Sequence, residues 1–481
     1  MQDPHVTMPS SMSRGPVIAA WLLGALTALA LAGSVYRIPI QVSDSLEVIQ
    51  RVVPMPSATS AFVEGLHNSP TMLRPLRDAG TKLLVQAGES LGGRYYFVFR
   101  GYHALAGGIL IGLFLWVCRA RTWTDVGALA VALAVLTGLH TFVGLFRESF
   151  PFNQFLIVAI CTLGTFAMAQ TRGGWLADLV VVGLLAAAAL SVESGLLVWP
   201  VAVASYVSGL RGISKRGLIA LTIALAVYGG ARLHYLTAPS LGVGQRATGF
   251  GAGVLTPEEQ VARFRANPLP FYAYNVTAAA ASVLFSQPTA GRFTLVNAWR
   301  LGPLPPVFLL QIGSSLMMTL LIGWYAMGRD PQSRRRRWRE PILLVFVTVL
   351  VANALMSYVY AKDEVISAAG VFYALAAFQA LRAFASRPLT PWIAPVVVIA
   401  AMSLSTAWAV RSVGLHLKLR QGAYDARTDW AFVFGPRARE TWPKDDHTIR
   451  VVSRMRDEVL MQRTIAPSLL PPWTERWWGE D

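Results

Sequence analysis

The chain has 481 residues, of which 54% are hydrophobic and only 14% charged, and its formal net charge is +16. Soluble globular domains carry about 25% charged residues, so this composition excludes an ordinary soluble fold and predicts a polytopic membrane protein. The charge excess does not indicate nucleic-acid binding, because much of it lies in short segments between apolar runs, where it orients membrane helices. The two cysteines, Cys118 and Cys161, lie within apolar runs, which excludes a disulfide framework and a paired-thiol metal site.

Eleven apolar runs approach the length of about 20 residues that a membrane helix needs. The fifth and sixth runs form one stretch broken only by "SVESG", and we divide them at Glu193 because about 35 residues exceed one crossing. The first run exceeds the 7–15 residues of a signal-peptide core, so we expect it to remain as an anchor. The predicted helices lie near 16–36, 101–118, 124–145, 152–170, 175–192, 194–210, 216–236, 303–327, 341–361, 365–384 and 391–411.

Basic residues are concentrated in alternate connections between these runs. Such connections are cytoplasmic by the positive-inside rule, which places the N-terminus inside and the C-terminal tail outside. The Ala-, Gly- and Arg-rich composition favours a bacterial protein, so the expected location is the inner membrane. The basic connections contain Arg119, Arg121, Arg172, Arg211, Lys215, Arg216, Arg329, the run "RRRRWR" at 334–339, Arg382 and Arg387.

Two long extracytoplasmic loops are expected to carry amphipathic helices. The first, 37–100, contains "SPTMLRPLRDAGTKLLVQAGESLGG", whose apolar spacing suits a helix at the membrane surface. The second, 237–302, contains "TPEEQVARFRA", with Thr256 as helix cap and Glu259 three residues later. Residues 271–285 are compatible with either a re-entrant helix or a crossing. We therefore predict an all-α membrane domain over 1–411 and an extracytoplasmic tail over 412–481.

Ionisable residues gather at the predicted outer ends of these helices. Such residues cost several kcal/mol to insert into a bilayer, so they are candidates for a functional site. No Gly-rich phosphate loop, zinc-type His pair or Ser-centred elbow accompanies them. What these residues have in common is that all of them are predicted to lie on the outer face of the membrane. The set comprises Asp44 after the first helix, His140 and Glu148 around the next outer turn, Glu193, Arg232 and His234, then Lys362, Asp363 and Glu364, with Arg74 and Arg77 on the surface helix.

Each candidate also has a structural interpretation. Asp44, followed three residues later by Glu47, is compatible with helix capping as well as with a catalytic base. Arg147 and Glu148 are compatible with an exposed ion pair of little energetic weight. His140 and His234 are compatible with hydrogen bonding between helices.

The layout resembles the GT-C superfamily of integral-membrane glycosyltransferases. The resemblance rests on three segments: "VSDSL" with Asp44, "LHTFVGLFRESFPFNQ" with His140 and Glu148, and "LSVESGLLVWPVAV" with Glu193. It covers roughly residues 16 to 240. The chain departs from many members of the superfamily in having Asp44 alone instead of an adjacent acidic pair. A divalent metal is therefore possible but not indicated, and no other cofactor is expected.

The resemblance implies an inverting sugar transfer from a polyprenyl-phosphate donor to a hydroxyl of a glycan or lipid acceptor. Asp44 would be the general base. Arg232, Lys362, Arg74 and Arg77 would stabilise the departing lipid phosphate, and Glu193 and Glu148 would bind sugar hydroxyls or orient those cations. Donor, acceptor and membrane lipids are the expected partners.

Three other functions stay open. A flippase or secondary transporter for a lipid-linked or anionic substrate also uses polar groups in membrane helices, although usually near the bilayer midplane and in two related halves. A structural or assembly protein could use its acidic turns to bind partners. Another membrane transferase, such as a ligase or acyltransferase, is the remaining alternative.

Overall fold

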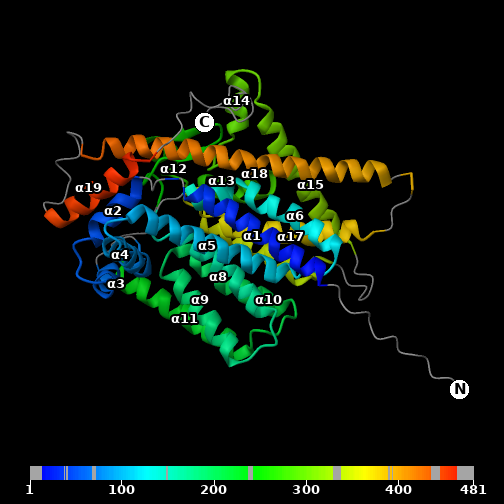
Figure 1. The fold of residues 1–481 in the computed structure, drawn as a ribbon, viewed down its shortest axis with the longest axis horizontal. Helices are drawn as coiled ribbons and strands as arrows, with labels where there is room; N and C mark the ends of the chain where they lie inside the picture. The colour runs from blue at the N-terminus through cyan, green and yellow to red at the C-terminus, as the bar shows by residue number, and fades with distance from the viewer. Residues whose placement is uncertain are drawn as a thin grey trace.

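The computed structural model describes residues 14–36, 38, 42–67, 72–147, 150–236, 242–328, 337–387, 391–392, 394–434 and 445–462. Within these ranges the chain is a bundle of helices with one two-stranded antiparallel hairpin, β1 (Thr248–Phe250) and β2 (Gly253–Leu255). The expected all-α architecture is confirmed. The bundle is elongated, with most of its long helices running along its length (Figure 1).

Six helices in the described part of the chain are long and apolar enough to cross a membrane. Two further helices, α6 (Trp123–Gly138) and α7 (His140–Arg147), are bent by 63° and make a seventh span if they are counted together. The other predicted runs form shorter helices of 16 residues or fewer, about 24 Å at 1.5 Å per residue, which is less than the roughly 30 Å hydrocarbon core. The predicted count of eleven spans is therefore not confirmed. The six are α1 (Gly15–Val35), α5 (Tyr95–Cys118), α11 (Lys215–Tyr235), α15 (Pro306–Met327), α17 (Ser367–Ala385) and α18 (Ala394–Ala431), and the shorter ones include α8 (Gln154–Ala169), α9 (Trp175–Ala189), α10 (Val198–Val207) and α16 (Pro341–Met356).

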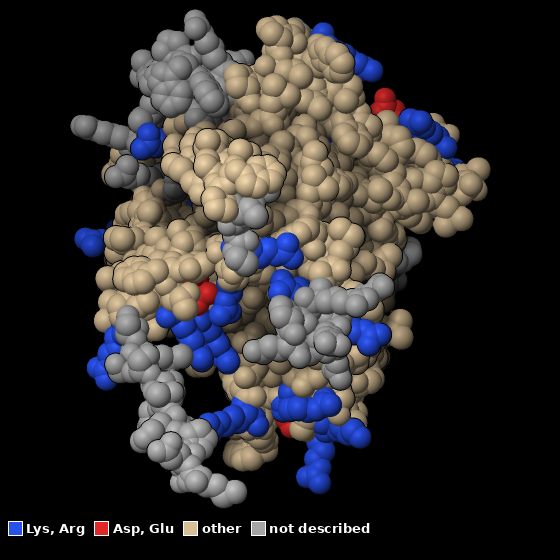
Figure 2. All heavy atoms as spheres, turned by 90° about the vertical axis from the view of Figure 1, so that its right-hand side faces the viewer, with Lys and Arg blue, Asp and Glu red and all other residues tan. Residues whose placement is uncertain are grey.

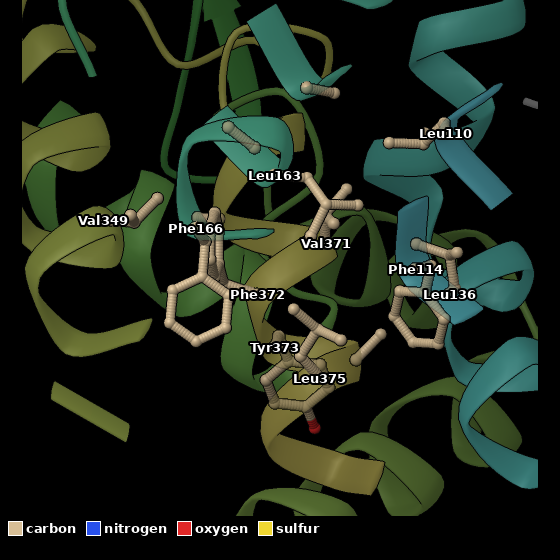
Figure 3. Packing of buried hydrophobic residues seen from close by; sticks show 14 of the residues in the cluster. Leu110, Phe114, Leu136, Leu163, Phe166, Val349, Val371, Phe372, Tyr373 and Leu375 are labelled. Carbon is tan, nitrogen blue, oxygen red and sulfur yellow. The ribbon is translucent and has the colours of Figure 1, made fainter. Parts of the chain in front are cut away.

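Helix α17 is the centre of the bundle. It packs against α5, α6, α7, α8, α13, α15 and α16, and of the six it is the most buried. Seven of its buried residues are Ala or Gly, and small side chains let membrane helices approach closely where the hydrophobic effect gives little attraction between them. Figure 3 shows Val371, Phe372 and Leu375 of this helix among apolar side chains of α5, α6, α8 and α16.

The basic connections meet at one end of the bundle. Arg382 at the end of α17 pairs with Asp125 in the first turn of α6 at 2.7 Å. Arg119, after α5, donates to the Gln170 carbonyl after α8 at 3.4 Å. Arg387 lies over the Trp324 ring near the end of α15, 4.2 Å from its centroid. Figure 2 shows this end, where Lys and Arg greatly outnumber Asp and Glu. We call it the basic end.

The first long loop forms three helices at the opposite end: α2 (Ser43–Val52), α3 (Ala58–His67) and α4 (Pro75–Ser90), which appear together in Figure 1. The helix predicted in this loop is α4. It packs against α3, α2 and α5, and so has neighbours on several sides.

Within the second long segment, α13 (Leu269–Phe285) does not join the two ends of the bundle. Near its start, the Asn275 amide donates to the Tyr358 and Val359 carbonyls just beyond α16. After its end, the chain returns to the same region, where the Ala290 N–H donates to Asp363 at 3.0 Å. This segment is therefore re-entrant in form. It follows α12 (Pro257–Phe264), whose predicted capping box of Thr256 and Glu259 is confirmed, and precedes α14 (Thr294–Leu301).

The last long helix extends well beyond the predicted range of 391–411. At 38 residues, α18 is about 57 Å long, so it continues past the span that the apolar run predicts. Its far part and α19 (Asp446–Leu460) enclose a second apolar core with α2, α4 and α5, which includes Ile49, Val85, Phe99, Trp430 and Val452. The C-terminal segment thus packs on the first long loop, as Figure 1 shows.

A buried arginine of α18 holds the inner end of α13. The Arg411 guanidinium donates to the hydroxyls of Ser286, Ser314 and Ser315 at 2.7, 2.9 and 2.8 Å. It also lies 3.8 Å from the centroid of the Trp408 ring. A charge in a bundle core needs such partners, because no water is there to solvate it. Sequence analysis did not single out Arg411.

We expect Arg411→Ala to lower the free energy of unfolding by about 3 kcal/mol, because it leaves buried hydroxyls without a partner and a cavity beside Trp408. Arg420→Ala, at an exposed position of the same helix, is the control and should change it by less than about 0.5 kcal/mol. Unfolding in SDS titrations, followed by tryptophan fluorescence, measures both. Equal effects of the two substitutions would contradict the role of Arg411.

Candidate functional site

Glu193 lies between two arginines at the end of the bundle opposite the basic end. Its carboxylate accepts from Nη2 and Nε of Arg74 at 2.6 and 3.1 Å, and from Nη1 of Arg232 at 3.3 Å. Arg232 also contacts the hydroxyl of Tyr228 at 3.5 Å. The Arg74 and Glu193 side chains are only 11% and 24% exposed, so this pair is shielded from water. Three residues that the sequence places in separate segments therefore meet in one ion-pair cluster.

Local structure explains why these three residues meet. Arg74 immediately precedes α4, whose first turn is attached to the end of α9 by the hydrogen bond from Leu76 N to Leu190 O at 3.0 Å. Glu193 opens η1 (Glu193–Leu197), the short turn that the sequence predicted between two apolar runs. Gly195 is needed in this turn, because a Cβ there would lie 2.1 Å from the carbonyl carbon of Ala188. Arg232 is in the last turn of α11, which packs on α9.

Further cations and two tyrosines surround this cluster. Tyr360, in the turn after α16, interacts electrostatically with Arg74. Arg246 lies over the Tyr360 ring at 4.8 Å from its centroid, and the Lys362 amine is 5.9 Å from the same centroid. Lys362 pairs with Glu364 at 3.2 Å. In this part of the described chain four cations, Arg74, Arg232, Arg246 and Lys362, lie near three carboxylates, Glu193, Asp363 and Glu364.

Arg74 stays charged in this setting. Burial lowers the pKa of its guanidinium, but the Glu193 carboxylate and its hydrogen bond more than offset burial, and the pKa is raised above its usual value. In this cluster the basic side chains outnumber the carboxylates by one. It can attract a polyanionic group such as a phosphate, and it contains hydroxyl and ring surfaces suited to a sugar.

His140 and Asp363 form a second contact beside the same turn. His140 opens α7 at the bend after α6, and its Nε2 lies 3.5 Å from the Asp363 carboxylate. A Cβ on Gly144 would be 3.0 Å from the backbone N of Glu364, so α7 rests directly against this turn. Both predicted residues thus lie with the segment that carries Lys362 and Glu364.

Arg77 takes a different partner from the one predicted. Its Nε donates to Asp78 at 3.0 Å, and the same carboxylate accepts two hydrogen bonds from Arg51 at 2.8 Å each. Burial lowers the pKa of the Arg77 guanidinium, and the Asp78 charge opposes this effect. Arg77 therefore belongs to a separate ion-pair group with Asp78 and Arg51, and its role in holding phosphate stays a prediction.

The remaining predicted residues lie apart or outside the described part. His234 is exposed on α11, and its ring packs edge-on against Tyr235 at 4.9 Å between centroids. Glu148 lies outside the described residues, as does the side chain of Asp44. Asp44 is the second residue of α2, whose N-cap is Val42, so it does not occupy the cap position that one interpretation gave it. Among the described residues, no group of three or more His, Cys, Asp or Glu side chains could hold a metal ion.

Sequence reasoning missed several members of the site. Tyr228 could have been found, because it precedes Arg232 by four residues and shares its helix face. Arg246, Tyr360 and the Arg51–Asp78 pair have no such local signal, since their partners come from distant segments.

Comparisons with protein-family models, curated proteins and solved structures gave no match for this chain. The site is therefore interpreted from its own geometry, in which a shielded carboxylate between two arginines is surrounded by further cations.

A double-mutant cycle on Arg74→Ala and Glu193→Ala should give a coupling energy of about 2 kcal/mol, because both charges are largely buried and each depends on the other. The control cycle uses Lys362→Ala and Glu364→Ala, where the lysine is 40% exposed, and should give less than about 1 kcal/mol. Unfolding free energies from SDS titrations supply both values. A coupling at Arg74–Glu193 no larger than the control would show that the cluster is solvated.

Proposed function

We propose that this protein is an inverting membrane glycosyltransferase that moves a sugar from a polyprenyl-phosphate donor to an acceptor hydroxyl. The observation that supports this best is the excess of cations around Glu193, because the donor's phosphate needs fixed positive charges beside the membrane. The donor class itself comes from the resemblance to the GT-C superfamily. The acceptor is a glycan or a lipid.

The proposed reaction needs one base and one anion site. The acceptor oxygen attacks the anomeric carbon and forms the new glycosidic bond, while the bond from that carbon to the phosphate oxygen breaks. The electron pair of the broken bond leaves with the polyprenyl phosphate. Asp44 takes the proton of the acceptor hydroxyl, a role in which a positioned carboxylate contributes about 10²- to 10⁴-fold to the rate.

The cluster around Glu193 would hold the leaving phosphate. Arg74 and Arg232 offer guanidinium groups that can bind phosphate oxygens in pairs, and Lys362 adds a mobile point charge. Glu193 bridges the two arginines and orients them, and with Glu148 it would accept hydrogen bonds from sugar hydroxyls. His140 and Asp363 lie where they can support the turn that bears Lys362.

We place the proposed reaction on the extracytoplasmic face of a bacterial inner membrane, in a multi-pass protein with a cytoplasmic N-terminus. The support for this orientation is the grouping of the basic connections at the opposite end of the bundle. A lipid-linked donor has its phosphate at the membrane boundary, so the site would meet the donor there.

The first test uses the full-length protein in nanodiscs with synthetic polyprenyl-phosphate-linked glucose, mannose and arabinose. A detergent extract of membrane glycans and lipids supplies the acceptor hydroxyls, and wild-type protein should transfer the sugar of one of these donors to an acceptor hydroxyl, or to water, and release polyprenyl phosphate. Asp44→Asn should lower that rate at least about 100-fold, because the amide cannot accept the proton. Asp446→Asn, at an exposed position of α19, is the control and should leave the rate unchanged.

Other outcomes would contradict this proposal in different ways. A normal rate in folded Asp44→Asn protein would remove Asp44 as the base. Movement of an intact labelled donor between leaflets, with no release of polyprenyl phosphate by wild-type protein, would favour a flippase instead.

Substitution of the two arginines tests the anion site separately. Arg74→Gln or Arg232→Gln should raise the KM for the donor about tenfold or more, because each removes a charge-assisted bond to phosphate worth about 1.5–3 kcal/mol. Arg300→Gln, at an exposed position of α14, is the control. Initial rates over a range of donor concentrations give the comparison, and unchanged KM values in both variants would place the phosphate elsewhere.

A further inference from the structure

Two buried polar residues of α5 bind backbone carbonyls shortly before Asp44 and on either side of Glu148 in the sequence. Arg100 and His103 are three residues apart on one face of this helix, and both are fully buried. The Arg100 Nε donates to the Ile38 carbonyl at 2.6 Å, and its Nη1 lies 3.4 Å from the Phe146 carbonyl. The His103 Nε2 lies 3.1 Å from the Phe150 carbonyl.

The contact between the two residues determines the state of the imidazole. Arg100 Nη1 lies 2.9 Å from His103 Nδ1, and a guanidinium can only donate. Nδ1 must therefore accept and carry no proton, so the ring proton is on Nε2. That proton faces the Phe150 carbonyl, which can only accept. His103 is thus a neutral link that receives a hydrogen bond from Arg100 and passes one on to the chain beyond α7.

The three carbonyls that this pair binds lie at or beyond the ends of helices. Ile38 follows the end of α1, Phe150 lies between α7 and α8, and Phe146 is in the last turn of α7. A carbonyl at the end of a helix or between helices needs a hydrogen-bond donor from elsewhere in the protein. Within a membrane bundle no water can take that place, so an unpaired carbonyl is costly. Arg100 and His103 supply these donors from inside the bundle.

The positions of these carbonyls relate the pair to the proposed chemistry. Ile38 precedes Asp44 by six residues, while Phe146 and Phe150 lie two residues to either side of Glu148. We infer that Arg100 and His103 are positioning residues that fix the chain at Ile38, Phe146 and Phe150, and so hold the described ends of the segments that lead to Asp44 and Glu148. The hydrogen bonds are observed directly, and the link to catalysis rests on the proposed function.

Hydrogen exchange, measured by mass spectrometry on the full-length protein in nanodiscs, tests without any substrate whether Arg100 and His103 hold these segments in place. Arg100→Lys keeps the positive charge but loses the branched guanidinium that reaches both carbonyls. The amide hydrogens of peptides covering 36–42 and 146–150 should therefore both exchange about tenfold faster. His103→Leu should accelerate 146–150 much more than 36–42. His103→Gln offers one acceptor and one donor, and should restore slow exchange. Arg94→Lys, at the exposed position that immediately precedes α5, is the control.

The donor assay adds a kinetic measurement that a general packing defect would not reproduce. Arg100→Lys should lower kcat at least about tenfold, because small displacements of a catalytic group are costly, while the KM for the donor stays within about threefold. His103→Gln should recover most of the kcat that His103→Leu loses.

Unchanged exchange of both turns in Arg100→Lys and in His103→Leu would overturn the inference, as would equal loss of kcat in His103→Gln and His103→Leu. If wild-type protein transfers no sugar, the proposed function fails, whereas the exchange of the two turns still decides whether this pair holds them.

Discussion

Buried polar groups in this bundle need partners within the protein, and that constraint shapes both of its ends. A hydrocarbon environment offers neither water nor hydrogen bonds, so each charge or free carbonyl between the helices must be matched from a neighbouring segment. Arg411 binds three serines of α13 and α15, Arg100 binds the chain after α1, and Glu193 binds Arg74 and Arg232. These contacts are what attach the irregular segments to the regular helices.

The apolar core is held together by the close packing of helices against one another. Helix α17 has a surface of Ala and Gly that several helices approach, and this packing leaves the charged residues at its two ends. At one end are Arg382 and the basic connections, and at the other the turn with Asp363 and Glu364. The bundle therefore separates a basic end from one where carboxylates and cations are interleaved.

The re-entrant segment and the C-terminal segment complete the second end. Ala290, after α13, binds Asp363, and so connects the long second loop with the turn next to His140. The C-terminal helix α19 packs beside α2, the helix that bears Asp44, and the Tyr96 N–H at the start of α5 donates to Glu458 of α19 at 3.0 Å. The first long loop, the segment after α13 and the C-terminal segment thus all lie at this end of the bundle.

The sequence by itself determined the class of protein, the position of most long helices, the grouping of the basic connections and the turn at Glu193. These features depend on local patterns of apolar residues, charge and caps, which can be read along the chain. It did not determine the number of spans, since shorter helices such as α8 are as apolar as longer ones, nor the full length of α18. Only the tertiary structure decided that Glu193 pairs with Arg74 and Arg232. The same holds for the ion pair of Arg77 with Asp78, and for the hydrogen bonds from Arg100 to carbonyls of two distant segments. Except for the adjacent residues Arg77 and Asp78, each of these contacts joins groups far apart in sequence, and which of the many available partners meet is determined by which helices pack together.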